Sequence, residues 1–253
     1  MIVVAWLRIA AFVGLSCAVS SLAALGHAML LPWPAARMRF AARCTGWWSR
    51  LGCASLRVRI DVDGRAPRGT FVAVANHVSY LDILVLGALF PTVFVAKHEI
   101  ASWPAFGLVA RSGGTLFVDR ASARDVVRVG REIDAALACG VSVTLFPEGQ
   151  ATDGREVLPF QPPLLAPAAR AAVPCHAIAL RYTSPDPTVR PRVDLAWPEG
   201  VTLTRHLARL ASLRGGVRAS VRIAGTPVIS DDRKDLARLL HREVTARYVP
   251  MES

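Results

Sequence analysis

Beyond residue 55, the chain alternates between short β-rich runs and longer helical stretches. This alternation is typical of a domain in which helices flank a β-sheet. We predict strands at 56–62, 70–75, 93–96, 115–118, 142–146, 176–182, 192–197 and 218–224. Several of these runs are nearly all apolar, so we expect them at the centre of the sheet. With 253 residues, the chain can form a single α/β domain with a mostly central β-sheet, and it is too short for two independent cores.

Two helices of this domain are predicted from their capping signals. The first covers 123–139, with Ser122 as its N-cap, Asp125 three residues further on and Gly140 as its terminator. The second begins near Ser230, where acidic residues complement the helix dipole. The apolar residues expected to face the core are Val126, Val129, Ile133 and Leu137 in the first helix and Leu236, Leu239, Leu240 and Val244 in the second.

An apolar segment at 9–31 is interrupted only by three serines and a histidine. As a helix of about 23 residues it would be ~34 Å long, enough to span or enter a bilayer. Arg8 precedes the segment and Pro32 ends it. A cleaved signal peptide is the alternative, because Gly26-His27-Ala28 resembles a small-residue cleavage site, but the segment is long for a signal-peptide core. The sequence therefore predicts a helical membrane anchor.

The next segment, 35–51, interleaves four arginines with aromatic side chains that include Trp47 and Trp48. This mixture is typical of a helix at the headgroup level of a membrane, although an ordinary surface helix packed on the domain has the same composition. We therefore divide the chain into a membrane-anchoring part at 1–51 and a catalytic domain at 52–253. The arginines after the apolar segment favour a domain on the cytoplasmic side of the inner membrane.

The formal net charge of +11 indicates an anionic partner, which could be nucleic acid, an acidic lipid surface or a phosphorylated substrate. The sequence has no helix-turn-helix, zinc-finger or RNA-recognition signature, so we expect no nucleic-acid partner. Its 5 cysteines are scattered, without a CxxC pair. This spacing argues against a disulfide framework and a zinc site, and a reducing compartment fits best.

The run NHVSYLD at 76–82 directly follows an apolar predicted strand, and ligand sites often form at strand ends in such sheets. A histidine accepts a proton at neutral pH best when a carboxylate holds its other ring nitrogen. His77 and Asp82 could form this pair. Five residues apart on a regular helix they would be ~140° apart, so a turn must lie between them.

Polar side chains follow three further predicted strands. Glu148 and Gly149 belong to the run FPEG, Arg120 closes the run GGTLFVDR, and Lys97 follows FVA. A carboxylate beside a glycine can bind a polyol hydroxyl or hold an arginine, and an arginine suits an anionic headgroup. Four strand ends with such groups predict one shared site.

The ordered runs NHVSYLD, FVAKHEI, GGTLFVDR, FPEG and AVPCHAIALRY resemble the glycerolipid acyltransferase family, which includes 1-acylglycerol-3-phosphate acyltransferases. The resemblance covers residues 56–247, and NHxxxxD and FPEG are its most specific parts. It implies that His77 is the general base for the acceptor hydroxyl, that Asp82 orients it, and that no covalent acyl-enzyme forms. The residues that the resemblance assigns to substrate binding are Asn76, Lys97, Arg120, Glu148 and Gly149.

The resemblance also implies the partners of the reaction. The acyl donor would be acyl-CoA or acyl carrier protein, and the acceptor would be a lysolipid reached at a membrane surface. Neither a metal nor another cofactor is needed for this chemistry. Among lysolipids, 1-acylglycerol-3-phosphate (lysophosphatidate) is the first expectation, with phosphatidate as its product.

One departure from the family pattern concerns the acceptor. Phosphate-binding members commonly have Thr-Arg-Ser after FPEG, whereas this chain has Gln150, Ala151 and Thr152, followed by Asp153 and Gly154. The missing arginine removes a bidentate partner for a phosphate. The Asp-Gly pair is similar to that of lyso-ornithine lipid acyltransferases, so a lyso-ornithine lipid is the alternative acceptor.

Two other classes of protein compete with an acyltransferase. A thioester or phosphate hydrolase could use the His77 and Asp82 pair to activate water, but the sequence has neither a Gly-x-Ser-x-Gly elbow nor a metal-ligand cluster. A non-catalytic lipid-binding protein would not need this pair. The sequence therefore favours the acyltransferase.

Overall fold

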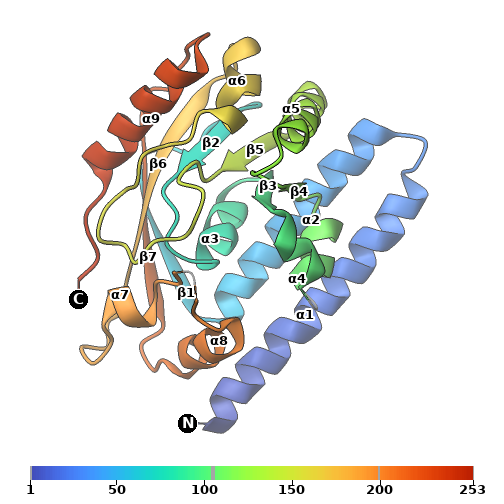
Figure 1. The fold of residues 1–253 in the computed structure, drawn as a ribbon. Helices are drawn as coiled ribbons and strands as arrows, with labels where there is room; N and C mark the ends of the chain where they lie inside the picture. Colours follow the sequence, from blue (N-terminus) through green and yellow to red (C-terminus); the bar gives the residue numbers. More distant parts are fainter. Residues whose placement is uncertain (1, 104–105, 199, 253) are drawn as a thin grey trace.

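The structure is a computed structural model that describes residues 2–103, 106–198 and 200–252. Within these residues, a seven-stranded sheet has the order β1-β7-β6-β2-β5-β3-β4 (Figure 1). Neighbouring strands are parallel except β6 and β7, which are antiparallel. The strands are β1 (Val58–Asp63), β2 (Val72–Ala75), β3 (Thr92–Lys97), β4 (Leu116–Val118), β5 (Ser142–Leu145), β6 (Cys175–Thr183) and β7 (Val217–Ile223).

The predicted strands agree with this sheet except at one segment. All residues of β2 and β5 are buried, so these apolar strands are central as expected. The strand predicted at 192–197 is wrong, because the segment begins as the short helix α7 (Pro191–Asp194). Pro191 suits the first position of a helix, and the Asp194 carboxylate accepts a hydrogen bond from the Arg190 main-chain N–H at 2.8 Å.

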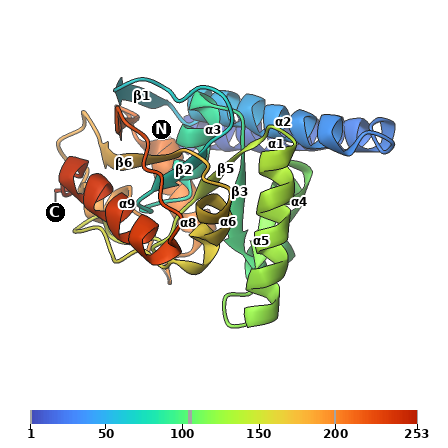
Figure 2. The same cartoon turned by 90° about the horizontal axis from the view of Figure 1, so that it is seen from above.

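Helices cover both faces of the sheet (Figure 2). Side chains of α2, α3 and α8 pack on one face in one hydrophobic core, and those of α5, α6 and α9 pack on the other. The predicted α/β domain with a central sheet is therefore confirmed. Besides α7, the helices are α1 (Ile2–Met29), α2 (Pro34–Ser55), α3 (Leu81–Leu89), α4 (Phe106–Ser112), α5 (Ala123–Ala138), α6 (Ala166–Arg170), α8 (Leu203–Ser212) and α9 (Arg233–Arg247), with 3₁₀ turns η1 (His98–Ser102) and η2 (Pro163–Leu165).

The two helices predicted from capping signals are present. Ser122 caps α5 by accepting a hydrogen bond from the Asp125 main-chain N–H at 3.2 Å, and Gly140 follows with a φ of +73°. Asp232 caps α9 and accepts from the two main-chain N–H groups of Lys234 and Asp235. The core-facing residues predicted for α9 include Leu236, Leu240 and Val244, which are buried.

Helix α1 lies along the outside of the domain, side by side with α2 (Figures 1 and 2). Its stretch Val3–Met29 is long and apolar enough to cross a membrane, and only 22% of its most apolar window is buried against the protein. Three polar side chains tie it to the domain. Arg8 donates to the carbonyls of Ala211 and Leu213 at the end of α8, Ser16 accepts from the indole N–H of Trp48, and Ser20 accepts from the Ser112 hydroxyl.

Helix α2 is part of the domain core. Trp48 and Cys53 are buried in the same hydrophobic cluster as α3, whereas Trp47 is 42% exposed. Gly87 of α3 lets the helices approach so closely that an added Cβ would lie 2.3 Å from the Ser49 hydroxyl. The boundary predicted between residues 51 and 52 falls within α2.

Candidate active site

His77 lies on the loop that leads from β2 into α3, and Asp82 lies at the start of α3. His77 Nδ1 is 2.7 Å from Asp82 Oδ2, and the same oxygen accepts the main-chain N–H groups of Val78 and Ser79 at 2.8 and 3.0 Å. These bonds form the turn that the five-residue spacing requires. Asp82 is 0% exposed and lies in the first turn of α3, where the helix dipole and the N–H groups favour a buried negative charge.

The imidazole of His77 is oriented by this carboxylate. Since a carboxylate only accepts, the proton of the neutral ring is assigned to Nδ1, and Nε2 keeps its lone pair for an incoming proton. The ring also stacks on Phe146, with centroids 4.3 Å apart and planes at 20°. Asp82 and Phe146 therefore fix the orientation of the His77 ring, and Nε2 remains available as a base.

Glu148 supports the same loop from the side of the FPEG run. One carboxylate oxygen accepts the His77 main-chain N–H at 2.7 Å, and the other accepts the Leu158 main-chain N–H at 2.8 Å. Burial raises the pKa of Glu148 to about 7, against the opposing effect of these two bonds. Both oxygens are used within the protein, and Glu148 does not line the cavity described below.

Asn76 is likewise engaged with main-chain groups. Its amide donates to the Leu180 carbonyl at 2.9 Å and accepts the Leu180 N–H at 2.7 Å, which fastens the end of β2 to β6. Asn76 is also outside the cavity lining. For Asn76 and Glu148, the geometry favours support of the His77 loop over the substrate contact that the family resemblance implies.

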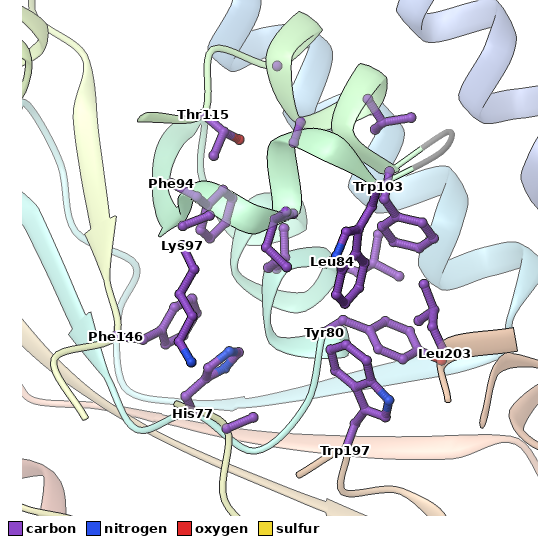
Figure 3. Close-up of a pocket in the computed structure, with 18 of the residues that line it drawn as sticks. His77, Tyr80, Leu84, Phe94, Lys97, Trp103, Thr115, Phe146, Trp197 and Leu203 are labelled. Atoms are coloured by element: carbon purple, nitrogen blue, oxygen red, sulfur yellow. The ribbon is translucent and has the colours of Figure 1, made fainter. Parts of the chain in front are cut away.

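His77 forms part of the wall of a cavity of about 590 Å³, a size typical of small-molecule sites (Figure 3). Most of the lining is apolar and comes from distant parts of the chain. Helix α1 contributes Phe12, Val19 and Ser20. Aromatic residues from several other segments also line the cavity: Trp48, Tyr80, Phe94, Trp103, Phe106, Phe146 and Trp197.

Charged groups in the lining include Lys97, Arg120 and Glu99. Lys97 extends from β3 into the cavity, on the side where His77 and Phe146 lie (Figure 3). Glu99 and Arg120 attract each other electrostatically. Gly149, with a φ of +87°, makes room for Arg120, because a Cβ at this position would lie 2.6 Å from the Arg120 Nη1. The structure thus gathers three predicted residues, Lys97, Arg120 and Gly149, around the cavity of His77.

The residues after FPEG divide between the cavity and contacts elsewhere in the protein. Gln150 and Ala151 line the cavity, whereas Asp153 forms an ion pair with Arg192. An added Cβ on Gly154 would lie 2.6 Å from the sulfur of Met251, so this glycine packs against the C-terminal segment. The Asp-Gly pair that departs from the family pattern therefore has structural partners in this chain.

Sequence reasoning missed two contributors to the site. Tyr182 contacts Asp82 from β6, and helix α1 supplies part of the cavity wall. The only sequence signal for Tyr182 was its place at the end of the run AVPCHAIALRY. Across the described residues, the structure shows no group of three or more His, Cys, Asp or Glu side chains placed to hold a metal ion.

A histidine at the end of a strand, in the wall of an apolar cavity, suits an enzyme whose substrates carry apolar groups. Residues 57–181 match the family model described as Acyltransferase, and the chain belongs to this acyltransferase family. The resemblance stated from the sequence motifs is thereby confirmed.

Several relatives are named for reactions on lipid substrates. The chain is 37% identical over 205 residues to the lyso-ornithine lipid O-acyltransferase of Pseudomonas aeruginosa, covering 80% of this chain and 77% of that protein. It is 40% identical over 132 residues to the 1-acyl-sn-glycerol-3-phosphate acyltransferase of Neisseria gonorrhoeae, covering 51% of each. The crystal structure of the 1-acyl-sn-glycerophosphate (LPA) acyltransferase PlsC from Thermotoga maritima has the same fold, with a TM-score of 0.58, 19% identity, and 97% and 100% of the two chains covered.

Proposed function

We propose that this acyltransferase moves a fatty acyl group from a thioester to the free hydroxyl of a lysolipid, with His77 as the general base. The observation that carries the proposal is the free Nε2 of His77 in the wall of an apolar cavity. Nε2 would take the proton of the hydroxyl while the oxygen attacks the thioester carbonyl carbon. As the carbon–sulfur bond breaks, the leaving thiolate would recover this proton from the imidazolium.

The apolar lining of the cavity supports long-chain substrates at this base. Its apolar part would hold an acyl chain, since burying such a chain releases water from apolar surface on both sides. The polar groups near His77 would then face the reacting ester and the acceptor headgroup. Either acyl-CoA or acyl carrier protein would supply the thioester.

We also propose that α1 enters the inner membrane and that the domain faces the cytoplasm. The exposed side of α1 carries large apolar residues that nothing in the described structure covers, and arginines of α2 follow it. A cavity partly walled by α1 would then open beside the lipid from which both substrates come.

For the acceptor, we place a lyso-ornithine lipid ahead of lysophosphatidate. Ornithine acylated on one amine keeps a carboxylate and an ammonium group. Lys97 and Arg120 would bind the carboxylate, and Glu99 would bind the ammonium. Ala151 cannot offer a phosphate the fork that an arginine would give. A relative that matches 80% of this chain and is named for the lyso-ornithine reaction agrees with this order.

Lysophosphatidate, the first expectation from sequence, remains the second candidate. Lys97 and Arg120 supply two cations that could bind its phosphate, and relatives named for this acceptor share about half of the chain. Among the described residues of the lining, Glu99 is the carboxylate that would oppose the more highly charged headgroup. The two candidates therefore differ in their dependence on Glu99.

A competition assay tests both the reaction and the acceptor. Purified enzyme receives a labelled acyl thioester with equal concentrations of the two lysolipids, and the products are separated. We expect the ornithine product to exceed phosphatidate tenfold or more, about 1.4 kcal/mol in transition-state binding. Glu99→Gln should reduce this preference, whereas Glu156→Gln, at an exposed position outside the cavity lining, should not. A preference for lysophosphatidate would overturn the acceptor, and release of free fatty acid without either product would overturn the transferase reaction.

A further inference from the structure

Tyr182 contacts the carboxylate of Asp82 at the oxygen that His77 does not use. Its hydroxyl donates to Asp82 Oδ1 at 2.5 Å, while Oδ2 carries the bonds from His77, Val78 and Ser79. Tyr182 and Asp82 are both 0% exposed. With these four donors, each carboxylate oxygen is hydrogen-bonded, and Tyr182 is the one side-chain donor on Oδ1 among the described residues.

The placement of Tyr182 depends on the same strand that anchors the His77 loop. Asn76 is bonded to both main-chain groups of Leu180, and Tyr182 lies two residues further along β6, on the same face of the strand. The register of β2 and β6 therefore fixes the distance between the loop that carries the base and the strand that carries the phenol. Any slip of β6 would separate Tyr182 from Asp82.

We propose that Tyr182 is a positioning residue that acts on His77 through Asp82. Its hydrogen bond fixes the rotation of the carboxylate, so that Oδ2 stays in line with Nδ1 of the base. It also draws negative charge toward Oδ1, which moderates the attraction of Oδ2 for the imidazolium. This role rests on the proposed function of His77, but it concerns only how that base is tuned.

The surroundings keep Tyr182 in its donating form. Burial and the neighbouring Asp82 hold the pKa of Tyr182 well above its usual value of 10, so the phenol stays protonated in the physiological range. Other titratable groups near the pair are Cys53 on α2, Glu148 after β5 and Tyr248 after α9. Tyr182 does not line the cavity, so it would not contact a substrate there.

The first test is Tyr182→Phe, which keeps the ring and removes only the hydroxyl. We expect kcat to fall roughly 10- to 100-fold, the range for losing one hydrogen bond to a charged group, with little change in KM for the acceptor. Because Oδ2 would then hold the imidazolium more strongly, the acidic limb of the pH–rate profile should move to higher pH. The matched control is Tyr248→Phe, which removes a phenol bonded to the neutral Gly154 carbonyl at 2.6 Å and should leave the limb in place.

A second variant reverses the perturbation without disturbing the packing. Incorporation of 3-fluorotyrosine at position 182 gives a more acidic phenol and a stronger donor, so the acidic limb should move to lower pH. An unshifted limb in both Tyr182 variants would overturn the inference, even if kcat falls, because loss of activity alone also follows from a packing defect. If His77→Ala retained activity, the proposed function itself would fail. An inactive His77→Ala with a normal Tyr182→Phe would remove only this inference.

Discussion

The imidazole of His77 lies nearly parallel to the ring of Phe146, with centroids 4.3 Å apart. This contact joins the two sequence runs that are most specific to the family, because His77 belongs to NHVSYLD and Phe146 to FPEG. Stacking on one face and a carboxylate on one edge leave the imidazole a single orientation in the cavity.

His77→Ala should abolish transfer with the fold intact. A positioned base contributes roughly 10²–10⁴ in rate, and the side chain is not part of the main core. Turnover by the purified variant is the measurement, and thermal unfolding reports the fold. His241→Ala, which removes a part-buried histidine outside the cavity lining, serves as the control and should remain active. Retention of more than a small fraction of turnover by His77→Ala would rule out its role as base.

Asp82→Asn should be similarly severe for a different reason. An amide cannot stabilise the imidazolium, and it can hold the wrong tautomer of His77; the rate loss should reach roughly 10⁴-fold, as in related His–Asp pairs. The NH2 of the amide must face either the N–H groups of Val78 and Ser79, which both donate to Oδ2, or the Tyr182 hydroxyl, which donates to Oδ1, so the melting temperature should fall. Activity close to wild type would show that the carboxylate is purely structural.

Glu148 should make stability depend on pH. Burial raises its pKa from 4.5 to about 7. Between these values the folded protein binds the proton more tightly than the unfolded chain, so the contribution of Glu148 is present below pH 4.5 and lost as pH rises through 7. The full shift corresponds to ~3 kcal/mol. We expect the free energy of unfolding of wild type relative to Glu148→Gln to decrease across this window, and parallel curves would contradict the raised pKa.

Ala151→Arg should move the acceptor preference toward lysophosphatidate. The new side chain would enter the cavity beside Gln150 and give a phosphate the charge-assisted contact that this chain lacks, worth roughly 1.5–3 kcal/mol. The ratio of kcat/KM for the two acceptors measures the change. Ala138→Arg adds the same charge at the exposed end of α5 and should leave the ratio unchanged.

Deletion of residues 2–31 should remove activity even in detergent, where neither substrate depends on a membrane. Phe12 and Val19 form part of the cavity wall, and Phe12 packs on Trp48, so the truncated protein would have an open cavity. Replacement of exposed Val4 and Leu25 by serine offers the comparison: it should weaken membrane binding and keep activity in detergent. Full activity of the deletion variant in detergent would show that α1 is only an anchor.

Most strands and the helix starts could be predicted from the sequence, because each depends on a local pattern of residues. Apolar runs bounded by turns marked the central strands, and Ser122 with Asp125 marked the start of α5. The failure at 192–197 has a local cause, since alternating apolar residues outweighed Pro191, which begins a helical turn there.

The partners of the candidate site were less accessible, because they depend on contacts between distant residues. Asn76 meets Leu180 across 104 positions, and Tyr182 meets Asp82 across 100. Strand order decides these pairs, and no spacing along the chain reveals it. The ion pair between Asp153 and Arg192 could not be predicted for the same reason.

The ties of α1 to the domain run from Arg8 through Ser16 to Ser20, about 18 Å of helix. A helix attached to the domain at three points is expected to keep a fixed position relative to it. If α1 enters the bilayer as proposed, the height of His77 relative to the lipid headgroups is set by the protein. Bilayers of different thickness would then present the acceptor hydroxyl at different distances from a base that cannot follow it, so turnover should depend on membrane thickness.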